Sequence, residues 1–261
     1  MKMLAAVLAT AFAFAGVSTA RAELKTAVVE YRQGDVALEG YLAYDDSFQG
    51  KRPGVLVVHE WYGHTPYVRK RAEQLARLGY VAFASDIYGK GVLAKDAKEA
   101  AALAGIYLGD RKLLRARAAA GLDVLRNRPE VDPARLAAIG YCFGGTTVLE
   151  LARGGADLAS VVSFHGLLNT PTPGDARNIK GKVLVLHGGD DPYVPMKQVE
   201  AFQEEMRNGG VDWQFVTYGG AVHRFTNPEA GSDNSKGAAY NERADCRSWG
   251  AMKAFFAETL K

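Results

Sequence analysis

Short runs of consecutive apolar residues recur along the chain and alternate with longer segments whose apolar residues stand three or four apart. A short continuous apolar run is typical of a strand buried on both faces, whereas the wider spacing predicts a helix. The predicted buried strands are Val55–Val58, Val81–Ser85, Leu136–Ile139, Ser160–Phe164, Val183–His187 and Trp213–Tyr218. The predicted helices are Tyr67–Leu78, Lys95–Leu108, Arg111–Arg126, Thr146–Arg153, Pro195–Asn208 and Glu242–Leu260. Strands that alternate with helices predict an α/β fold, with a mainly parallel central sheet and helices on both faces.

A different pattern precedes the first buried strand. Thr26–Tyr31 and Val36–Tyr44 alternate loosely between apolar and polar residues on either side of Gly34 and Asp35, which predicts an antiparallel hairpin. We find no internal repeat and no low-complexity tract. Residues 23–261 are numerous enough for one large core, and we expect them to form a single α/β domain.

The first 22 residues have the pattern of a secretory signal peptide. They combine a basic start at Lys2, an almost wholly apolar run from Leu4 to Val17 and an Ala-Arg-Ala cleavage pattern at residues 20–22. The apolar run is too short for a transmembrane anchor, since a spanning helix needs about 20 apolar residues. We therefore expect residues 1–22 to be removed and the protein to be periplasmic or secreted.

Charge gives no indication of a polyanionic partner. The whole chain holds 32 basic and 29 acidic residues, and without Lys2 and Arg21 the basic count falls to 30. A nearly neutral mature chain has no electrostatic basis for binding nucleic acid or an anionic membrane. No later segment is apolar enough to span a bilayer, so we expect no membrane contact after signal removal. The sequence does not predict the oligomeric state.

Candidate chemistry starts at the stretch Gly140-Tyr141-Cys142-Phe143-Gly144, which follows a predicted strand and opens a predicted helix. This is the context of a nucleophile elbow, in which the central residue occupies a strained strand-to-helix turn. Flanking glycines suit such a corner because it leaves no room for β-carbons. At a helix N-terminus the dipole and the free N–H groups favour a thiolate and a developing oxyanion. We therefore predict that Cys142 is a nucleophile.

An acid and a base follow in the order that this kind of elbow requires. Asp190 and Asp191 come directly after the predicted strand Val183–His187, and His223 lies on a glycine-rich loop after Trp213–Tyr218. Spacing alone does not decide between the two aspartates. The other four histidines are interpreted as packing or hydrogen-bonding residues (His59, His64, His165 and His187). The histidines lack paired metal-ligand spacing, so no metal and no cofactor is predicted.

Two cysteines allow a competing interpretation. In an exported protein Cys142 and Cys246 could form a disulfide or serve a redox role. Two cysteines in so long a chain are not a disulfide framework, and no C-x-x-C pair is present. The position of Cys142 at the predicted elbow favours the nucleophile.

At these residues the chain resembles the dienelactone hydrolase family of α/β-hydrolases, over nearly all of residues 23–261. The motifs that carry the resemblance are V-V-H-E-W-Y-G at Val57–Gly63, S-D-I-Y-G at Ser85–Gly89, G-Y-C-F-G-G at Gly140–Gly145, D-P-Y-V-P at Asp191–Pro195 and H-R-F-T-N-P at His223–Pro228. Together they are specific, although each alone would be weak.

The resemblance implies a role for each matching residue. Cys142 resembles the family nucleophile and His223 its base, and Asp191 resembles the acid because it begins D-x-x-V-P. The backbone N–H groups of Trp61 and Phe143 would form the oxyanion hole.

Glu60 matches the family glutamate that contacts the resting thiol. A carboxylate beside a thiol disfavours the thiolate by like-charge repulsion and can accept the S–H proton, so Glu60 would protect the resting cysteine from oxidation. Without the resemblance, Glu60 would be interpreted as a solvated loop carboxylate. Substrate binding would displace Glu60 and let His223 take the proton.

The chain departs from relatives that act on dienelactone, which hold its carboxylate with arginines. One of those arginines stands four residues beyond the histidine, where this chain has Asn227. The other arginine of those relatives lies in the segment before the elbow. Nearby lysines are interpreted as surface charge (Lys90, Lys95 and Lys98). These departures argue against an anionic diene lactone as the substrate, and we expect Tyr88, Phe225 and Asn227 to contact the substrate.

The leading prediction is a cysteine hydrolase of lactones or small carboxylic esters that works through a Cys142–His223–Asp191 triad and a thioester acyl-enzyme. Its expected partner is a small-molecule ester or lactone. The alternative is a non-catalytic periplasmic ligand-binding protein on a retained hydrolase fold. The intact set of candidate catalytic residues argues against that alternative.

Overall fold

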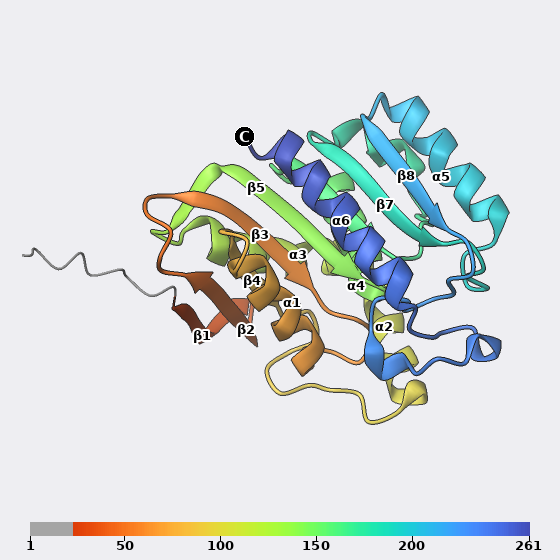
Figure 1. Cartoon of the computed structure of the whole chain (residues 1–261), viewed down its shortest axis with the longest axis horizontal. Coiled ribbons are helices and arrows are strands. Elements are labelled where there is room, and N and C mark those ends of the chain that lie inside the picture. Colours follow the sequence, from red (N-terminus) through yellow and green to blue (C-terminus); the bar gives the residue numbers. More distant parts are fainter. Residues whose placement is uncertain (1–22) are drawn as a thin grey trace, which may run out of the picture.

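A single eight-stranded sheet runs through the computed structural model, with helices packed on both of its faces (Figure 1). The structure describes residues 23–261, so the predicted signal segment 1–22 lies outside the described residues. The strands are β1 (Leu24–Gln33), β2 (Val36–Asp45), β3 (Arg52–Val58), β4 (Val81–Ser85), β5 (Val131–Tyr141), β6 (Ser160–Phe164), β7 (Lys182–Gly188) and β8 (Trp213–Tyr218). The α-helices are α1 (Pro66–Ala76), α2 (Ala97–Gly109), α3 (Arg111–Arg126), α4 (Phe143–Arg153), α5 (Met196–Gly209) and α6 (Glu242–Thr259). Three short 3-10 helices join them (Pro173–Asn178, Pro228–Ala230 and Asn234–Lys236).

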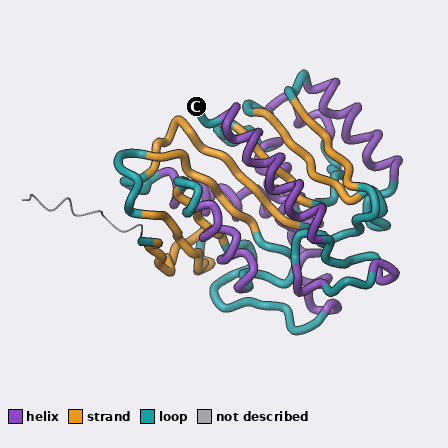
Figure 2. The backbone as a smooth tube through the Cα atoms, in the orientation of Figure 1, coloured by secondary structure: helices purple, strands orange, loops and turns teal. Residues whose placement is uncertain are grey.

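The sheet is parallel except at one edge. Its strand order is β1-β2-β4-β3-β5-β6-β7-β8, and the pairs from β4 to β8 are all parallel. β1 and β2 form the predicted antiparallel hairpin, and β2 joins β4 in antiparallel fashion. The predicted α/β-hydrolase class, with a mainly parallel sheet, is thus confirmed. Loops gather along the edge toward which the parallel strands run, in the lower part of the view (Figure 2).

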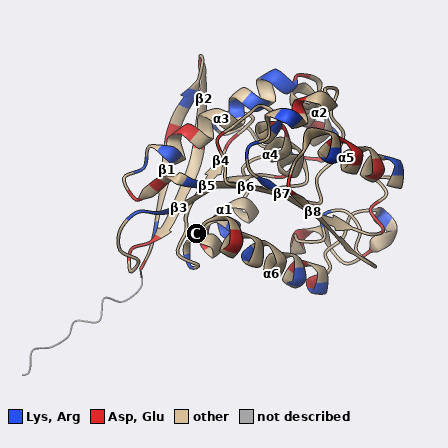
Figure 3. Cartoon of the chain, turned by 90° about the horizontal axis from the view of Figure 1, so that it is seen from above, with Lys and Arg blue, Asp and Glu red and all other residues tan. Residues whose placement is uncertain are grey.

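Two helical layers cover the two faces of the sheet. Seen from above, α1 and α6 lie on one side, and α3, α4 and α5 lie on the other (Figure 3). Alternate residues of one strand enter the two cores: Val55 and Val57 pack with α1 and α6, and Leu56 and Val58 pack with the opposite layer. Because successive side chains of a strand point to opposite faces, a strand covered on both sides needs the continuous apolar run seen in the sequence.

The elbow helix starts earlier than the sequence predicts. The predicted start was Thr146, but α4 begins at Phe143 and includes Gly144 and Gly145. These glycines are not helix breakers here, because each is needed for close contact: a Cβ on Gly145 would lie 2.7 Å from Ser163 Oγ. The early start places the elbow directly at the helix N-terminus.

Charged side chains are mixed over both helical layers, with acidic and basic residues interspersed (Figure 3). Across residues 23–261, no helix combines the length and the apolar character needed to cross a bilayer. Lys90, Lys95 and Lys98 are all exposed, and Lys90 pairs with Glu30. These lysines therefore have the surface positions that the sequence interpretation gave them.

Candidate active site

A nucleophile elbow forms at the predicted corner between β5 and α4. Cys142 occupies it with φ 55° and ψ −116°, a conformation that residues other than glycine rarely adopt. A Cβ on Gly140 would lie 2.0 Å from the Gly144 carbonyl oxygen, and one on Gly144 would lie 2.2 Å from the Val58 carbonyl oxygen. Both glycines are therefore required by the close approach of backbone on either side of the corner.

The structure brings the predicted nucleophile, base and acid together at one edge of the sheet. His223 Nε2 lies 3.0 Å from Cys142 Sγ, and His223 Nδ1 lies 2.8 Å from Asp191 Oδ2. The three residues follow β5, β7 and β8, so the carboxyl ends of these parallel strands carry the whole group. Burial lowers the pKa of His223, but the neighbouring Cys142 sulfur and Asp191 carboxylate raise it by more, to about 10.

The two adjacent aspartates occupy different environments. Asp191 is buried, and its second oxygen, Oδ1, accepts the Tyr193 N–H at 2.9 Å. Asp190 is exposed, and its backbone N–H is bound by the Ala221 carbonyl. The structure thus places Asp191, and not Asp190, against the imidazole.

Two backbone N–H groups flank the elbow. The Phe143 N–H belongs to the first turn of α4, where no carbonyl of the helix can accept it. Trp61 lies on the loop after β3. Hydrogen bonds to two carbonyls hold this loop: Tyr88 Oη donates to Trp61 O at 2.9 Å, and His59 Nδ1 lies 2.6 Å from Glu60 O. Among residues 23–261, neither the Trp61 nor the Phe143 N–H has a hydrogen-bond partner.

Glu60 does not make the contact expected from the resemblance. Arg224 binds its carboxylate in bidentate fashion, with Nε–Oε1 at 3.0 Å and an Nη2–Oε2 distance of 2.9 Å, and Asn227 Nδ2 donates to Oε2 at 2.6 Å. Within the described chain, the hydrogen-bond partner of the Cys142 sulfur is His223. The expectation that Glu60 accepts the thiol proton is therefore wrong for this structure, because Arg224 and Asn227 already occupy the carboxylate.

The residues expected to contact substrate are buried and make contacts within the protein. Phe225 has no exposed surface and packs against His165 and Tyr218, so it is not a pocket wall here. Asn227 is 1% exposed and holds Glu60. Tyr88 is 6% exposed and supports the Trp61 carbonyl. These positions do not present themselves to a ligand in this structure.

Three residues at the site have no functional role in the sequence analysis. Arg224 reaches Glu60 from a backbone with φ 57°, and its sequence signal is its place in the H-R-F-T-N-P motif. Tyr193 is 52% exposed, and its ring meets the His223 ring edge-on at 5.3 Å between centroids. His165 contacts both the elbow and the His223 loop, which we define as residues 219–227. Among residues 23–261, the non-glycine residues with positive φ are Cys142, His165 and Arg224, all at this site.

Both cysteines are free thiols. Cys142 is half-buried at the elbow, and Cys246 is exposed on α6. The intramolecular disulfide considered from composition is therefore not formed in the structure. No group of three or more histidine, cysteine, aspartate or glutamate side chains within residues 23–261 is arranged to hold a metal ion.

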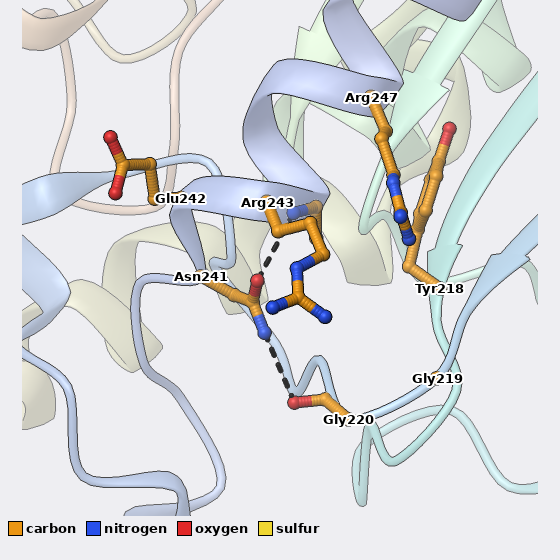
Figure 4. A pocket seen from close by; sticks show the side chains of 8 residues that line it. Tyr218, Gly219, Gly220, Asn241, Glu242, Arg243 and Arg247 are labelled. Carbon is orange, nitrogen blue, oxygen red and sulfur yellow. Dashed lines mark hydrogen bonds between the residues drawn. The ribbon is translucent and has the colours of Figure 1, made fainter.

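A polar pocket lies beside the candidate site rather than in it. It has a volume of about 510 Å³ and is lined by Tyr218, Gly219 and Gly220 on one side and by the first two turns of α6 on the other (Figure 4). Asn241 spans it, accepting the Ala244 N–H and donating to the Gly220 carbonyl at 3.2 Å. The helix cap thus anchors the His223 loop.

The family model for the dienelactone hydrolase family matches residues 38–260. The chain belongs to that family. It is 44% identical to the solved structure of m3DLH, with a TM-score of 0.88 over 91% of this chain and 99% of that chain. It is 43% identical to a dienelactone hydrolase-like promiscuous phosphotriesterase from metagenomic libraries, with a TM-score of 0.86 over the same shares. A Synechocystis protein named "Putative carboxymethylenebutenolidase" is 29% identical, over 92% of this chain and 99% of its own length.

These likenesses confirm the predicted family and the hydrolase fold of the chain. Both solved structures have sequences at least 43% identical to this chain, and the chain covers almost the whole length of each.

Proposed function

We propose that this protein hydrolyses lactones or small carboxylic esters through a Cys142–His223–Asp191 triad and a thioester acyl-enzyme. The observation that carries the proposal is the continuous contact from sulfur through imidazole to carboxylate, at 3.0 and 2.8 Å, on a strained elbow. Nucleophile and base within hydrogen-bond reach, with the base oriented by a third group, are the signature of an activated nucleophile. The Synechocystis relative is named as a carboxymethylenebutenolidase, which supports a lactone as one substrate.

The charge state of His223 suits it to assist the sulfur. A raised pKa keeps His223 protonated at neutral pH, so its Nε2–H faces the Cys142 sulfur as an imidazolium. Asp191 accepts the hydrogen bond of Nδ1–H and stabilises that positive charge. The N-terminus of α4 lies next to the sulfur and favours negative charge that develops there.

In the acylation step the Cys142 sulfur forms a bond to the substrate carbonyl carbon, and the carbonyl electron pair moves to oxygen. The free N–H groups of Trp61 and Phe143 would receive this oxyanion. When the carbonyl re-forms, the bond to the alkoxide breaks, and the leaving oxygen takes the proton from His223 Nε2. A thioester and a neutral imidazole remain.

Deacylation uses the same groups in the opposite protonation state. His223 removes a proton from water, whose oxygen attacks the thioester carbon. Collapse of the second tetrahedral intermediate breaks the carbon–sulfur bond and expels Cys142 as a thiolate, which restores its pair with the imidazolium. The product acid releases its proton to solvent.

We also propose that the protein acts outside the cytoplasm. The support is the signal pattern of residues 1–22, which lie outside the described residues. Mass measurement of the exported protein would test this: a mature N-terminus close to Glu23 is expected, and an intact Met1 in the cytoplasmic fraction would contradict it.

The deciding experiment is hydrolysis of p-nitrophenyl acetate and a panel of neutral and anionic lactones by Cys142→Ala, with Cys246→Ala as the matched control. We expect Cys142→Ala to abolish hydrolysis, because no other residue is on the elbow, and Cys246→Ala to keep the parent rate. Activity retained in Cys142→Ala would overturn the triad. Stoichiometric labelling of Cys142 without turnover on any ester would favour the non-catalytic binding protein instead.

A further inference from the structure

His165 connects the nucleophile elbow to the His223 loop. It follows β6 with φ 39°, is 1% exposed, and its Nδ1 lies 3.0 Å from the Cys142 backbone nitrogen. Its other ring nitrogen, Nε2, lies 2.7 Å from Thr226 Oγ1, three residues beyond His223 on the His223 loop. One imidazole thus spans from the backbone of the nucleophile to the loop that carries the base.

The hydrogen-bond partners fix the tautomer of His165. The Cys142 N–H is shared between His165 Nδ1 and the Phe164 carbonyl, each at 3.0 Å, and it can only donate. His165 Nδ1 is therefore an acceptor, and the ring proton is on Nε2. Nε2–H then donates to Thr226 Oγ1, whose own hydrogen is free to reach Tyr67 Oη at 2.7 Å. Burial, with further repulsion from His223 and Arg224, holds the pKa of His165 well below its ordinary value, which keeps this neutral form.

The far end of the bridge is anchored by two helices. Tyr67 Oη donates to the Thr226 carbonyl at 3.3 Å, and Arg71 Nη2 donates to the same carbonyl at 2.7 Å. Arg71, on α1, also pairs with Asp245, on α6, at 2.5 Å. The Thr226 end of the His223 loop therefore rests on a buried polar network, whereas its Gly220 end is tied to Asn241 at the start of α6 (Figure 4).

The His165 ring also packs directly on the base. Its centroid lies 5.4 Å from that of His223 and 5.1 Å from that of Phe225, and both pairs meet edge to face. The His165 ring thus contacts His223, Phe225 and the Cys142 backbone at the same time. Loss of its hydrogen bonds would let the elbow and the His223 loop shift relative to each other, and a misplacement of about 1 Å can cost about a hundredfold in rate.

We propose that His165 is a positioning residue that sets the distance between Cys142 Sγ and His223 Nε2 by bridging the Cys142 amide to Thr226. The proposal rests on the proposed function for its kinetic consequence, but the distance that it concerns is also reported by the thiol itself. It predicts that the two ends of the bridge act as one unit.

The test breaks the bridge from either end. His165→Asn suits the positive φ, since asparagine tolerates the left-handed region, but its side chain is too short to reach Thr226 while it contacts the elbow. Thr226→Val removes the hydroxyl and keeps the shape of the side chain, and Thr226→Ser restores the hydroxyl. Thr259→Val is the matched control, because it removes a hydroxyl that bonds Ser160 and Phe255 at the opposite end of α6.

We expect His165→Asn and Thr226→Val each to lower kcat on p-nitrophenyl acetate by about tenfold to a hundredfold with KM within about twofold of the parent. Thr226→Ser should stay within about twofold of the parent rate, and the double variant should be no slower than the slower single variant. Additive losses, or a Thr226→Val rate equal to that of Thr259→Val, would overturn the bridge.

A second measurement keeps the inference testable if no ester is turned over. The rate of Cys142 alkylation by iodoacetamide is followed against pH in folded protein, with the melting temperature of each variant recorded. If the contact between Cys142 and His223 is loosened, the pH midpoint of Cys142 alkylation should move upward in His165→Asn and Thr226→Val. Thr226→Ser and Thr259→Val should keep the parent midpoint. Unchanged midpoints in both bridge variants would refute the positioning role, whereas absent turnover with shifted midpoints would refute only the hydrolase.

Discussion

Two buried carboxylates enter the site from different loops, and each binds one of two neighbouring residues on the His223 loop. Asp191 binds His223, and Glu60 binds Arg224. Both pairs are largely buried, but Glu60 holds its partner in bidentate fashion and Asp191 holds its partner through one contact. An imidazole can exchange its proton during a reaction, and a guanidinium cannot. The Asp191 pair can therefore take part in proton transfer, whereas the Glu60 pair is a fixed element that shapes the loop.

The pKa values of Arg224 and His223 depend on different partners. Burial lowers the pKa of Arg224, and the charge and hydrogen bonds of Glu60 more than compensate, so Arg224 stays cationic. His223 depends on both Asp191 and the Cys142 sulfur for its raised pKa. Asp191 thus faces a ring that can titrate, and Glu60 faces a cation that keeps its charge.

Removal of the Asp191 charge should have the largest effect. Asp191→Asn keeps the shape of the side chain but no longer stabilises the imidazolium, so kcat on p-nitrophenyl acetate should fall by about 10³- to 10⁴-fold. Asp190→Asn is the matched control and should keep the parent rate, because Asp190 is exposed. Equal losses in the two variants would show that the adjacent aspartates share the role.

Removal of the Arg224 cation should affect the stability of the fold more than the rate of hydrolysis. Arg224→Gln leaves Glu60, 4% exposed at its side chain, without its ion pair, and should lower the free energy of unfolding by about 3 kcal/mol. Urea denaturation measures this loss. The double variant Glu60→Gln/Arg224→Gln should regain part of it, since no buried charge then remains unpaired; a double variant less stable than Arg224→Gln would contradict the assignment.

The titration of His223 should reveal its dependence on the sulfur. In Cys142→Ala the contribution of the sulfur is gone, so the pKa of His223 should fall from about 10 toward its ordinary value. Proton NMR of the imidazole ring protons follows this directly. His59 and His64 are internal controls, because burial holds the pKa of each at about 4 and the substitution should not move them.

Neutralisation of Glu60 should have the smallest effect. Glu60→Gln should move the pH midpoint of Cys142 alkylation downward by less than about half a unit, because Arg224 already offsets the carboxylate charge. A downward shift of more than about one unit would mean that Glu60 acts on the sulfur directly, as the family resemblance implied.

The sequence predicted the sheet and the edge at which the chemistry lies because both depend on patterns that are local in the chain. Apolar runs gave the buried strands, and glycines around Cys142 marked the corner whose steric demands the structure confirms. The order of nucleophile, acid and histidine then followed from strand order. The choice of Asp191 over Asp190 needed a family motif, since burial of one and exposure of the other is a tertiary property.

The errors concern side chains whose partners come from distant segments. Glu60 was expected at the thiol, but Arg224, 164 residues later, takes its carboxylate from a backbone with positive φ that no sequence pattern announced. Phe225 was expected at a pocket wall, but it enters the core beside His165. His165 was correctly interpreted as a hydrogen-bonding residue, although its two partners could be identified only in three dimensions.

The separation of the three reactive groups onto the loops after β5, β7 and β8 has a practical consequence for engineering. The long connection from β4 to α2, residues 86–96, carries none of them, but its Tyr88 donates to the Trp61 carbonyl and its Ala94 N–H donates to the Tyr62 carbonyl. A redesign of this connection would therefore have to keep Tyr88 and the Ala94 contact to leave the Trp61 loop in place, whereas the exposed side chains of Val92 and Leu93 are free to vary.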